Sequence, residues 1–180
     1  MTEDVGFDLI PCDPADETLI AAAKEEFKAE LNAASKASSK EGWVPVKTFG
    51  AKCDELFHHG VDLASNTFLA RHCGSYLDAP KDTLIISMVS NDRQLPFWKL
   101  APGKVLIFRP VDDELSEEAG FLRYIEGSHK ISNMEEATRA QGKDIRVRLD
   151  QMLIMDGDSV IRWPKTGGGI CILQGVLKKA

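Results

Sequence analysis

The stretch from Val111 to Lys130 reads VDDELSEEAGFLRYIEGSHK, and it sets the pattern for the C-terminal half of the chain. An acidic segment ends in Ala119-Gly120, which predicts a turn, and the run Phe121–Glu126 that follows predicts a β-strand. Gly127-Ser128 then marks the next turn. A short strand between two turns is typical of an antiparallel sheet.

Similar β-branched or alternating runs occur on both sides of this stretch. They predict strands over 7–10, 83–90, 104–111, 121–126, 145–155, 159–163 and 170–177. Turn sequences at 101–103, 156–158 and 167–169 separate them, and one short helix is expected near 134–141. Apart from this short helix, the strands predicted from residue 83 onward follow one another without helices between them. The pattern therefore favours an antiparallel sandwich or jelly roll over a parallel doubly wound sheet.

The N-terminal half carries a helical pattern instead. Asp13 and Pro14 suit the start of a helix, and apolar residues at helical spacing continue it to about residue 34. A second helical region covers 52–77 and breaks near Gly60, while 35–42 is a small, polar loop. We therefore predict one α+β domain over 1–180, in which mainly helical residues 1–80 support a β core over 81–180.

Composition excludes several classes of function. The chain has 180 residues, 22 Lys+Arg and 28 Asp+Glu, for a net charge of −6. An acidic chain without a basic block is a poor ligand for a nucleic-acid backbone. Its apolar runs are too short for a transmembrane helix, and the acidic Met1–Asp4 does not resemble a secretory signal. We expect a cytoplasmic protein with no nucleic-acid or membrane partner.

The four cysteines, at 12, 53, 73 and 171, match no zinc-binding spacing. Reduced thiols are the plain interpretation, and one structural disulfide is the alternative. The adjacent His72 and Cys73 would be the first place to seek a thiol nucleophile. However, neighbouring side chains point apart on both helices and strands, so this pair is weak evidence.

The stretch Val111–Lys130 resembles the phytanoyl-CoA dioxygenase-like family of iron- and 2-oxoglutarate-dependent oxygenases. That family shows a Leu-Asp-Asp-like strand end, an acidic loop with Gly, and then a strand of the form Leu-Arg-x-x-Pro-Gly-Ser-His-Lys. Residues 6–31, 69–77, 95–98 and 156–161 resemble further family segments in the same order. The resemblance implies N-terminal helices packed on an antiparallel double-stranded β-helix, that is, a cupin-like jelly roll.

The family's cofactor ligands are missing at the matching positions. Iron is held there by His-x-Asp or His-x-Glu before the segment matched by 95–98, and by a later His after the Gly-Asp turn. Here residues 91–94 are Asn-Asp-Arg-Gln, and no His follows His129. The Arg that clamps 2-oxoglutarate also has no counterpart between Gly167 and Val176. Since Gln and Lys do not replace imidazole and carboxylate as iron ligands, we predict no metal and no cofactor.

By position, the remaining pocket would use residues near the lost ligands. Asp92 is the predicted general base and Lys165 the general acid or electrostatic stabiliser of a non-oxidative isomerase- or cyclase-type reaction. The predicted substrate-binding side chains are Gln94, Trp98, Arg109, Arg123 and Trp163. The expected partner is a small-molecule ligand.

Two other functions stay open. The chain could be a non-catalytic interaction module or dimeric scaffold, with a homodimer as its expected form. Alternatively, it could be an active dioxygenase whose iron is held by His58 or His59, His72 and an Asp. For other features a structural role is favoured: His129 braces a turn, the acidic cluster at 112–118 is solvated, and Gly167–Gly169 forms a tight loop.

Overall fold

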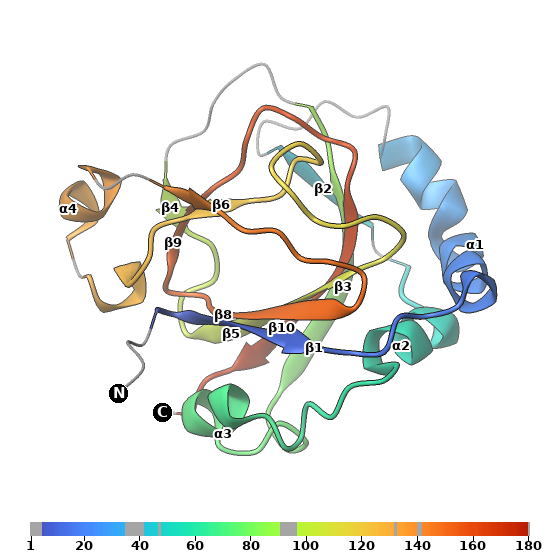
Figure 1. Cartoon of the computed structure of the whole chain (residues 1–180), viewed down its shortest axis with the longest axis horizontal. Coiled ribbons are helices and arrows are strands. Elements are labelled where there is room, and N and C mark those ends of the chain that lie inside the picture. Colours follow the sequence, from blue (N-terminus) through green and yellow to red (C-terminus); the bar gives the residue numbers. More distant parts are fainter. Residues whose placement is uncertain are drawn as a thin grey trace.

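The protein is described here by a computed structural model that covers residues 5–34, 42–46, 48–90, 97–131, 133–139 and 142–179. Its strands form two antiparallel sheets (Figure 1). The large sheet has the order β1 (Phe7–Pro11), β8 (Gln151–Asp156), β5 (Lys104–Pro110), β10 (Ile170–Leu177), β3 (Lys81–Met88) and β2 (Trp43–Val46). The small sheet has the order β4 (Trp98–Lys99), β9 (Val160–Arg162), β6 (Arg123–Tyr124) and β7 (Lys143–Asp144). The predicted α+β jelly-roll fold is confirmed.

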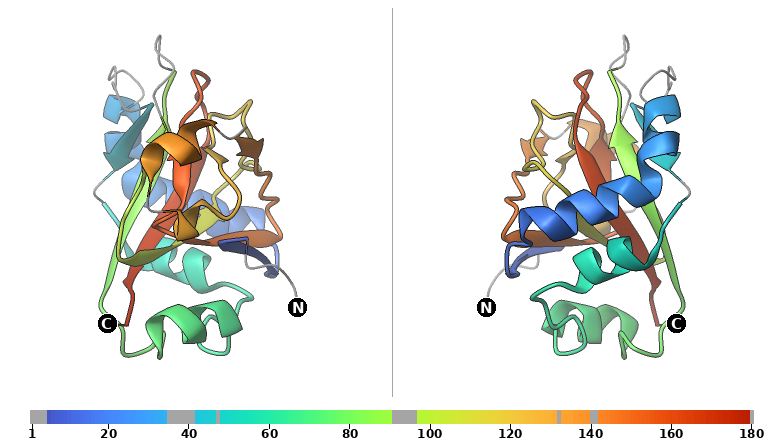
Figure 2. Two further views of the ribbon diagram at one scale, coloured as in Figure 1. Left: turned by 90° about the vertical axis from the view of Figure 1, so that its left-hand side faces the viewer. Right: turned by 90° about the vertical axis from the view of Figure 1, so that its right-hand side faces the viewer.

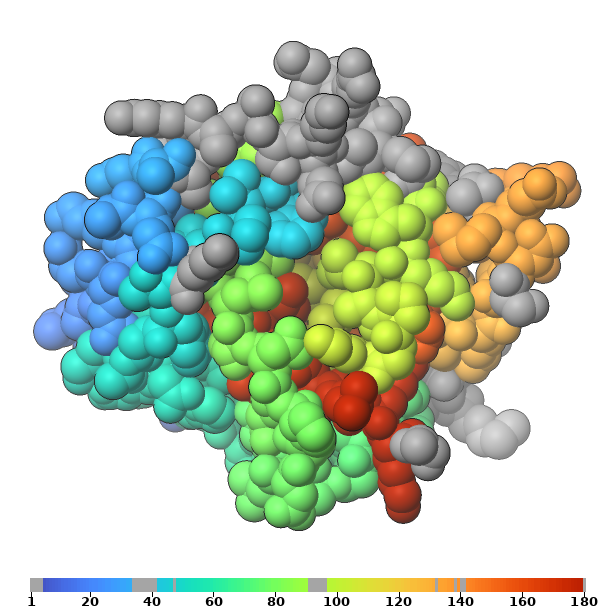
Figure 3. Space-filling view, turned by 180° about the vertical axis from the view of Figure 1, so that it is seen from behind, coloured from blue at the N-terminus to red at the C-terminus, as the bar shows by residue number. Residues whose placement is uncertain are grey.

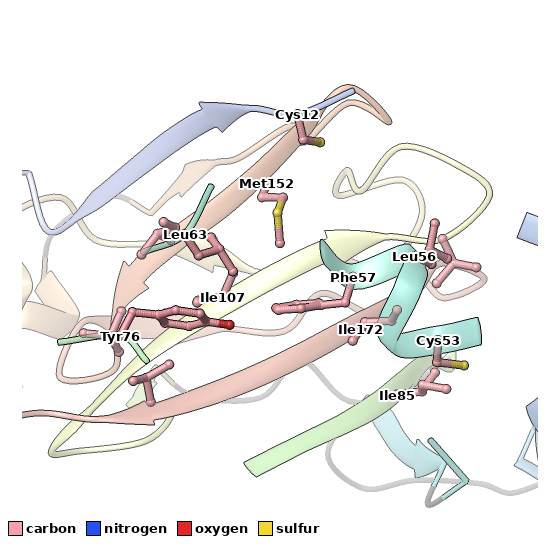
Figure 4. Packing of buried hydrophobic residues seen from close by; sticks show 14 of the residues in the cluster. Cys12, Cys53, Leu56, Phe57, Leu63, Tyr76, Ile85, Ile107, Met152 and Ile172 are labelled. Atoms are coloured by element: carbon pink, nitrogen blue, oxygen red, sulfur yellow. The ribbon is translucent and has the colours of Figure 1, made fainter. Parts of the chain in front are cut away.

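Three helices cover the outer face of the large sheet: α1 (Glu17–Ala34), α2 (Ala51–His58) and α3 (Thr67–Cys73). Figure 1 shows α1 at the right of the strands, α2 at the lower right and α3 below them, and in the right-hand view of Figure 2 α1 passes in front of the strands. Their apolar side chains and every second residue of the strands form the helix-side core, whose centre includes Phe57, Ile85, Ile107, Met152 and Ile172 (Figure 4). None of the described helices is long and apolar enough to cross a membrane.

The alternate strand residues face the small sheet. There they form the inter-sheet core, which includes Ile86, Phe108, Phe121, Leu153 and Trp163. Neighbours such as Ile85 and Ile86 therefore belong to different cores, as the two-residue period of a strand requires. On the other face of the small sheet, Val160 of β9 packs with Ala137 of α4 (Met134–Arg139) and with Ile131, which follows the short 3₁₀ helix η1 (Ser128–Lys130).

The Gly-Ser-His-Lys motif forms that 3₁₀ turn. The Ser128 hydroxyl is fully buried; it donates to the carbonyl of Ile125 at 2.5 Å and accepts from the backbone N–H of Val160 at 2.8 Å. The Gly127 N–H donates to the carbonyl of Val5 at 3.2 Å. The His129 ring packs on Gly6, where a Cβ atom would lie 2.4 Å from its Nδ1. This motif thus joins β6, β9 and the entry to β1.

Some predicted boundaries were wrong. The strand predicted over 145–155 begins only at Gln151, because 148–151 form a turn in which the Gln151 N–H donates to the carbonyl of Arg148 at 3.0 Å. The strand predicted over 121–126 is reduced to Arg123–Tyr124. Strands β2, β4 and β7 were not predicted at all. The loop predicted over 35–42 lies, except for Gly42, outside the described residues.

Candidate functional site

At one end of the jelly roll, the loop that follows β9 packs against the end of β3 and the loop before β6. The N–H groups of Gly168 and Gly169 donate to the carbonyls of Met88 and Ala119, both at 2.8 Å, and the Met88 N–H donates back to Gly169 at 2.9 Å. A Cβ atom on Gly167 would lie 2.4 Å from the backbone of Ser90. The glycines are therefore needed for this close approach, which is the tight loop that the sequence predicts.

Behind this loop, aromatic rings fill the space between the sheets. The Trp163 side chain is fully buried, with its ring centroid 6.1 Å from that of Phe121 and 6.4 Å from that of Trp43. Phe121 in turn lies 5.3 Å from Phe108. Trp98, half-buried on β4, packs against the same core. Trp98 and Trp163, the two tryptophans predicted to bind substrate, thus both pack in the apolar inter-sheet core.

Lys165 lies at the surface just beyond that interior. Together with Glu117, Glu118, Pro164 and Thr166 it lines an open pocket. The Thr166 hydroxyl donates to the backbone carbonyl of Glu117, which fixes the loop after β9 against the acidic loop before β6. The pocket therefore combines one ammonium group with two carboxylates.

The carboxyl group of Glu117 is perturbed. Burial raises its pKa; the Arg123 guanidinium counteracts this shift and the Asp144 carboxylate reinforces it, so the pKa lies above its ordinary value of 4.5. Arg123 Nη1 lies 3.6 Å from Glu117 Oε1, and its Nε lies 2.7 Å from Asp144 Oδ1. A carboxyl group with a raised pKa beside a cation in a pocket is a candidate for proton transfer.

Arg109, which was also predicted to bind substrate, is not part of this pocket. Arg109 is 1% exposed and points to the helix side of the large sheet, where it donates to the carbonyls of His59 (2.8 Å) and Asp13 (3.0 Å). It therefore joins three segments of backbone, on the face opposite Trp163. Asp92 and Gln94 lie outside the described residues, so their predicted roles stay predictions.

The metal-binding capacity of the described residues can be judged from their donor atoms. The buried charged side chains among the described residues are Arg109 and Asp156, and both face away from the inter-sheet core, because their neighbours Phe108 and Met155 belong to it. Within the described ranges, no three His, Cys, Asp or Glu side chains are grouped so as to hold a metal ion, the set of His58, His59 and His72 included. The four cysteines are buried free thiols. The described residues therefore do not supply the two imidazoles and one carboxylate that bind iron in this class of enzyme.

Sequence reasoning missed a second hollow, on the side of the jelly roll. Residues of β2, β3, β5 and β10, together with Leu100 and Ala101 just after β4, surround a cavity of about 140 Å³ between the two sheets, and its lining is largely apolar. The signal that could have indicated it is Gly175, in the middle of the otherwise bulky strand β10. A glycine inside a strand often marks a place where another group approaches the backbone closely.

Comparison with solved structures defines the class to which this fold belongs. The similar structures are proteins of the iron- and 2-oxoglutarate-dependent oxygenase type, and they share the jelly roll and its helices. No family profile matches the sequence, and no curated protein does.

Three of these structures illustrate the likeness. HygX from Streptomyces hygroscopicus, solved with nickel, 2-oxoglutarate and hygromycin B bound, has 14% identity and a TM-score of 0.60, with 97% of this chain and 83% of HygX covered. AviO1 from Streptomyces viridochromogenes Tue57 has 14% identity and a TM-score of 0.64, with 97% and 90% covered. SnoN, a non-heme alpha ketoglutarate dependent epimerase from nogalamycin biosynthesis, has 12% identity and a TM-score of 0.57, with 96% and 78% covered. Identities at this level establish the fold alone.

Proposed function

We propose that this chain is an oxygenase-fold protein of phytanoyl-CoA dioxygenase-like ancestry that works without iron and 2-oxoglutarate. Its function would be to bind a small molecule in the pocket beside Lys165 and, as an enzyme, to catalyse a non-oxidative isomerisation or cyclisation. The single observation that carries this proposal is the chemistry of the jelly-roll interior. Its core consists of hydrocarbon and aromatic side chains, and Trp163 stands close to the loop in which the last iron ligand would be expected.

The sequence of the undescribed segment supports the same proposal. Between Asn91 and Pro96, Asp92 is the one side chain of a type that commonly binds iron. A single carboxylate without imidazole partners would hold ferrous iron too weakly to retain it through dialysis. The absence of a basic residue from Gly167 to Val176 likewise removes the expected partner of the 2-oxoglutarate carboxylate.

The pocket beside Lys165 contains groups suited to acid–base chemistry. Glu117, whose pKa is raised, keeps its proton to a higher pH than an ordinary carboxyl group does. The Lys165 ammonium can stabilise negative charge that develops on a substrate oxygen. SnoN, described as an epimerase, indicates that a protein of this fold can serve an isomerisation, although SnoN does so with its cofactor.

An anaerobic titration with ferrous iron and 2-oxoglutarate tests the loss of the cofactors. We expect no metal-to-ligand charge-transfer absorption band, and no iron retained after dialysis. An iron- and 2-oxoglutarate-dependent enzyme of the same fold, treated in parallel, is the positive control. A band together with one retained iron per chain would overturn the proposal and favour an active dioxygenase with atypical ligands.

The roles of the pocket residues have their own test. Once a substrate is found by screening metabolites for thermal stabilisation, Lys165→Met should weaken its binding, and Glu117→Gln should lower turnover more than binding. Lys130→Met replaces a lysine of the Gly-Ser-His-Lys turn and serves as the matched control. Unchanged binding and turnover in both pocket variants would remove Lys165 and Glu117 from the site.

Two further parts of the proposal concern the surroundings of the chain. The four buried free thiols support a reducing compartment, and we propose the cytoplasm. The homodimer, which would serve a non-catalytic scaffold, stays a prediction. A strictly monomeric sedimentation profile at micromolar concentration would count against it.

A further inference from the structure

The cavity on the side of the jelly roll differs in chemistry and position from the pocket beside Lys165, and the two share no lining residue. Its floor is the inner face of the large sheet, where Leu84 and Leu173 are direct cross-strand partners. Leu100, next to β4, lies across from them, and Trp43 on β2 lines the cavity as well. Figure 3 shows the hollow, with atoms of β10 in red between β3 in green and the yellow-green residues near 100.

Gly175 opens the outer end of this cavity. Its cross-strand partners are Asp82 on β3 and Leu106 on β5. A Cβ atom at this position would lie 2.8 Å from Asp82 Oδ1 and 3.2 Å from Lys104 Cδ. In the space left by the missing side chain, Lys104 Nζ reaches Asp82 Oδ1 at 2.8 Å. The cavity therefore has an apolar interior and a charged rim.

The two rim groups differ in how firmly they are held. The Lys104 side chain is 37% exposed and lies along the cavity wall, whereas the Asp82 side chain is 61% exposed. An exposed ion pair of this kind contributes little free energy, so Asp82 can turn toward water at small cost. Lys104 would then present an ammonium group to another carboxylate at the mouth of an apolar cavity.

We infer that this cavity is a binding site for a small carboxylic acid with an aromatic or branched aliphatic body. Its volume of about 140 Å³ suits a group the size of a benzene ring, since an engineered apolar cavity of about 150 Å³ in another protein binds benzene. The body enters between the sheets against Leu84, Leu100 and Leu173, and the carboxylate replaces Asp82 on Lys104. The inference stands on this cavity alone and does not depend on whether the chain binds iron.

Benzoate is the probe that tests the site. In a protein with ¹³C-labelled leucine methyl groups, NMR titration should shift the signals of Leu84, Leu100 and Leu173, while Leu149 on the surface stays unchanged. Benzylamine, which has the same shape and the opposite charge, should bind more weakly than benzoate. Equal or stronger binding of benzylamine would overturn the assignment of a carboxylate.

Two rim variants test the role of the charge in opposite directions. Lys104→Met should weaken benzoate binding about three- to fivefold, the size expected of one exposed ion pair. Asp82→Asn should strengthen it, because the competing carboxylate is removed. Lys52→Met provides the matched control, since Lys52 also pairs with a surface carboxylate, that of Glu55, but on α2 behind the large sheet. If Asp82→Asn weakens binding as much as Lys104→Met does, the proposed exchange at the rim is wrong.

Two filled variants test the cavity itself. Gly175→Val fills the outer end from the floor, and Leu100→Trp fills it from the opposite sheet, so one remains informative if the other fails to fold. In a variant whose thermal transition is retained, benzoate should no longer shift the signals of Leu84 and Leu173. Shifts that persist in a folded, filled variant would overturn the inference. The absence of leucine shifts in the wild type at about 10 mM benzoate would overturn it as well, because this concentration is about ten times the Kd of about 1 mM that corresponds to −4.1 kcal/mol.

Discussion

Glu26 shows how one side chain positions a neighbouring helix. It lies on α1, yet its carboxylate accepts the backbone N–H groups of Lys52 (2.9 Å) and Cys53 (3.0 Å) in the first turn of α2. Gly50 leaves the room for this contact, because a Cβ atom there would lie 2.5 Å from Glu26 Oε2. A carboxylate at this place satisfies free N–H groups and interacts favourably with the helix dipole.

Replacing Glu26 should therefore destabilise the protein. Glu26→Ala is expected to lower the free energy of unfolding by about 1 kcal/mol, the usual cost of losing a helix cap. Urea denaturation followed by circular dichroism measures this change. Glu25→Ala is the control, because the exposed Glu25 carboxylate pairs with Lys28 at the surface and its loss should change the free energy much less.

The same carboxylate gives this effect a defined pH dependence. Burial acts to raise the pKa of Glu26, but the hydrogen bonds from α2 outweigh it, and the pKa lies below its ordinary value of 4.5. Because the pKa is lower in the folded state, the stabilisation is complete above 4.5 and is lost as the pH falls through the folded-state pKa. The difference between wild type and Glu26→Ala should thus shrink in acid, and a difference that grows would contradict the proposed cap.

At the scale of elements, the loop after β9 is held by close packing of its glycines against the end of β3. Gly167→Ala places a methyl group against the backbone of Val89 and Ser90, so we expect a loss of about 2–3 kcal/mol in the free energy of unfolding. Gly103→Ala is the comparison: nothing lies within 4 Å of its Cβ position, and only its φ of +80° opposes the substitution. That change should cost about 1 kcal/mol. Equal losses in chemical denaturation would mean that the loop is not tightly packed.

The sequence predicted those elements that carry a periodic signal. The β-branched runs of β3, β5 and β10 and the long helix α1 were found, because each repeats its pattern over several residues. Strand β2 escaped because Pro45 interrupts it, which is typical of an edge strand. Strands β4 and β7 have two residues each, too few to show any period.

The candidate sites depend on contacts that no local pattern contains. Lys165 and Glu117 are far apart in the sequence, and only the packing of two loops brings them to one pocket. Arg109 was expected at a pocket because it is a charged residue on a strand. The two-residue period instead places it with Val105 and Ile107 on the helix side, where backbone carbonyls satisfy it. The side cavity is formed by four strands and the segment after β4, and the sequence indicates it only through Gly175.

For the whole molecule, the large sheet is the structure that both cores need. Ile85 and Ile107 contribute to the helix-side core, while their neighbours Ile86 and Phe108 contribute to the inter-sheet core. Neither core can form before these strands pair, and the strands are buried only when both cores are present. This mutual dependence argues that the helices and the jelly roll unfold together, as the prediction of one domain over 1–180 requires.

Single-core variants test this cooperativity. Phe27→Ala removes a ring from the helix-side core and Phe121→Ala removes one from the inter-sheet core; each should cost about 3–5 kcal/mol. Far-UV circular dichroism reports the helices, and tryptophan fluorescence reports the inter-sheet core through buried Trp163 and the half-buried Trp43 and Trp98 beside it. In a two-state protein both signals must give the same denaturation midpoint, so each variant should lower the two midpoints equally. If Phe27→Ala moved the dichroism midpoint and left the fluorescence midpoint in place, the helices would constitute a separate unit, because their loss would leave the inter-sheet packing intact.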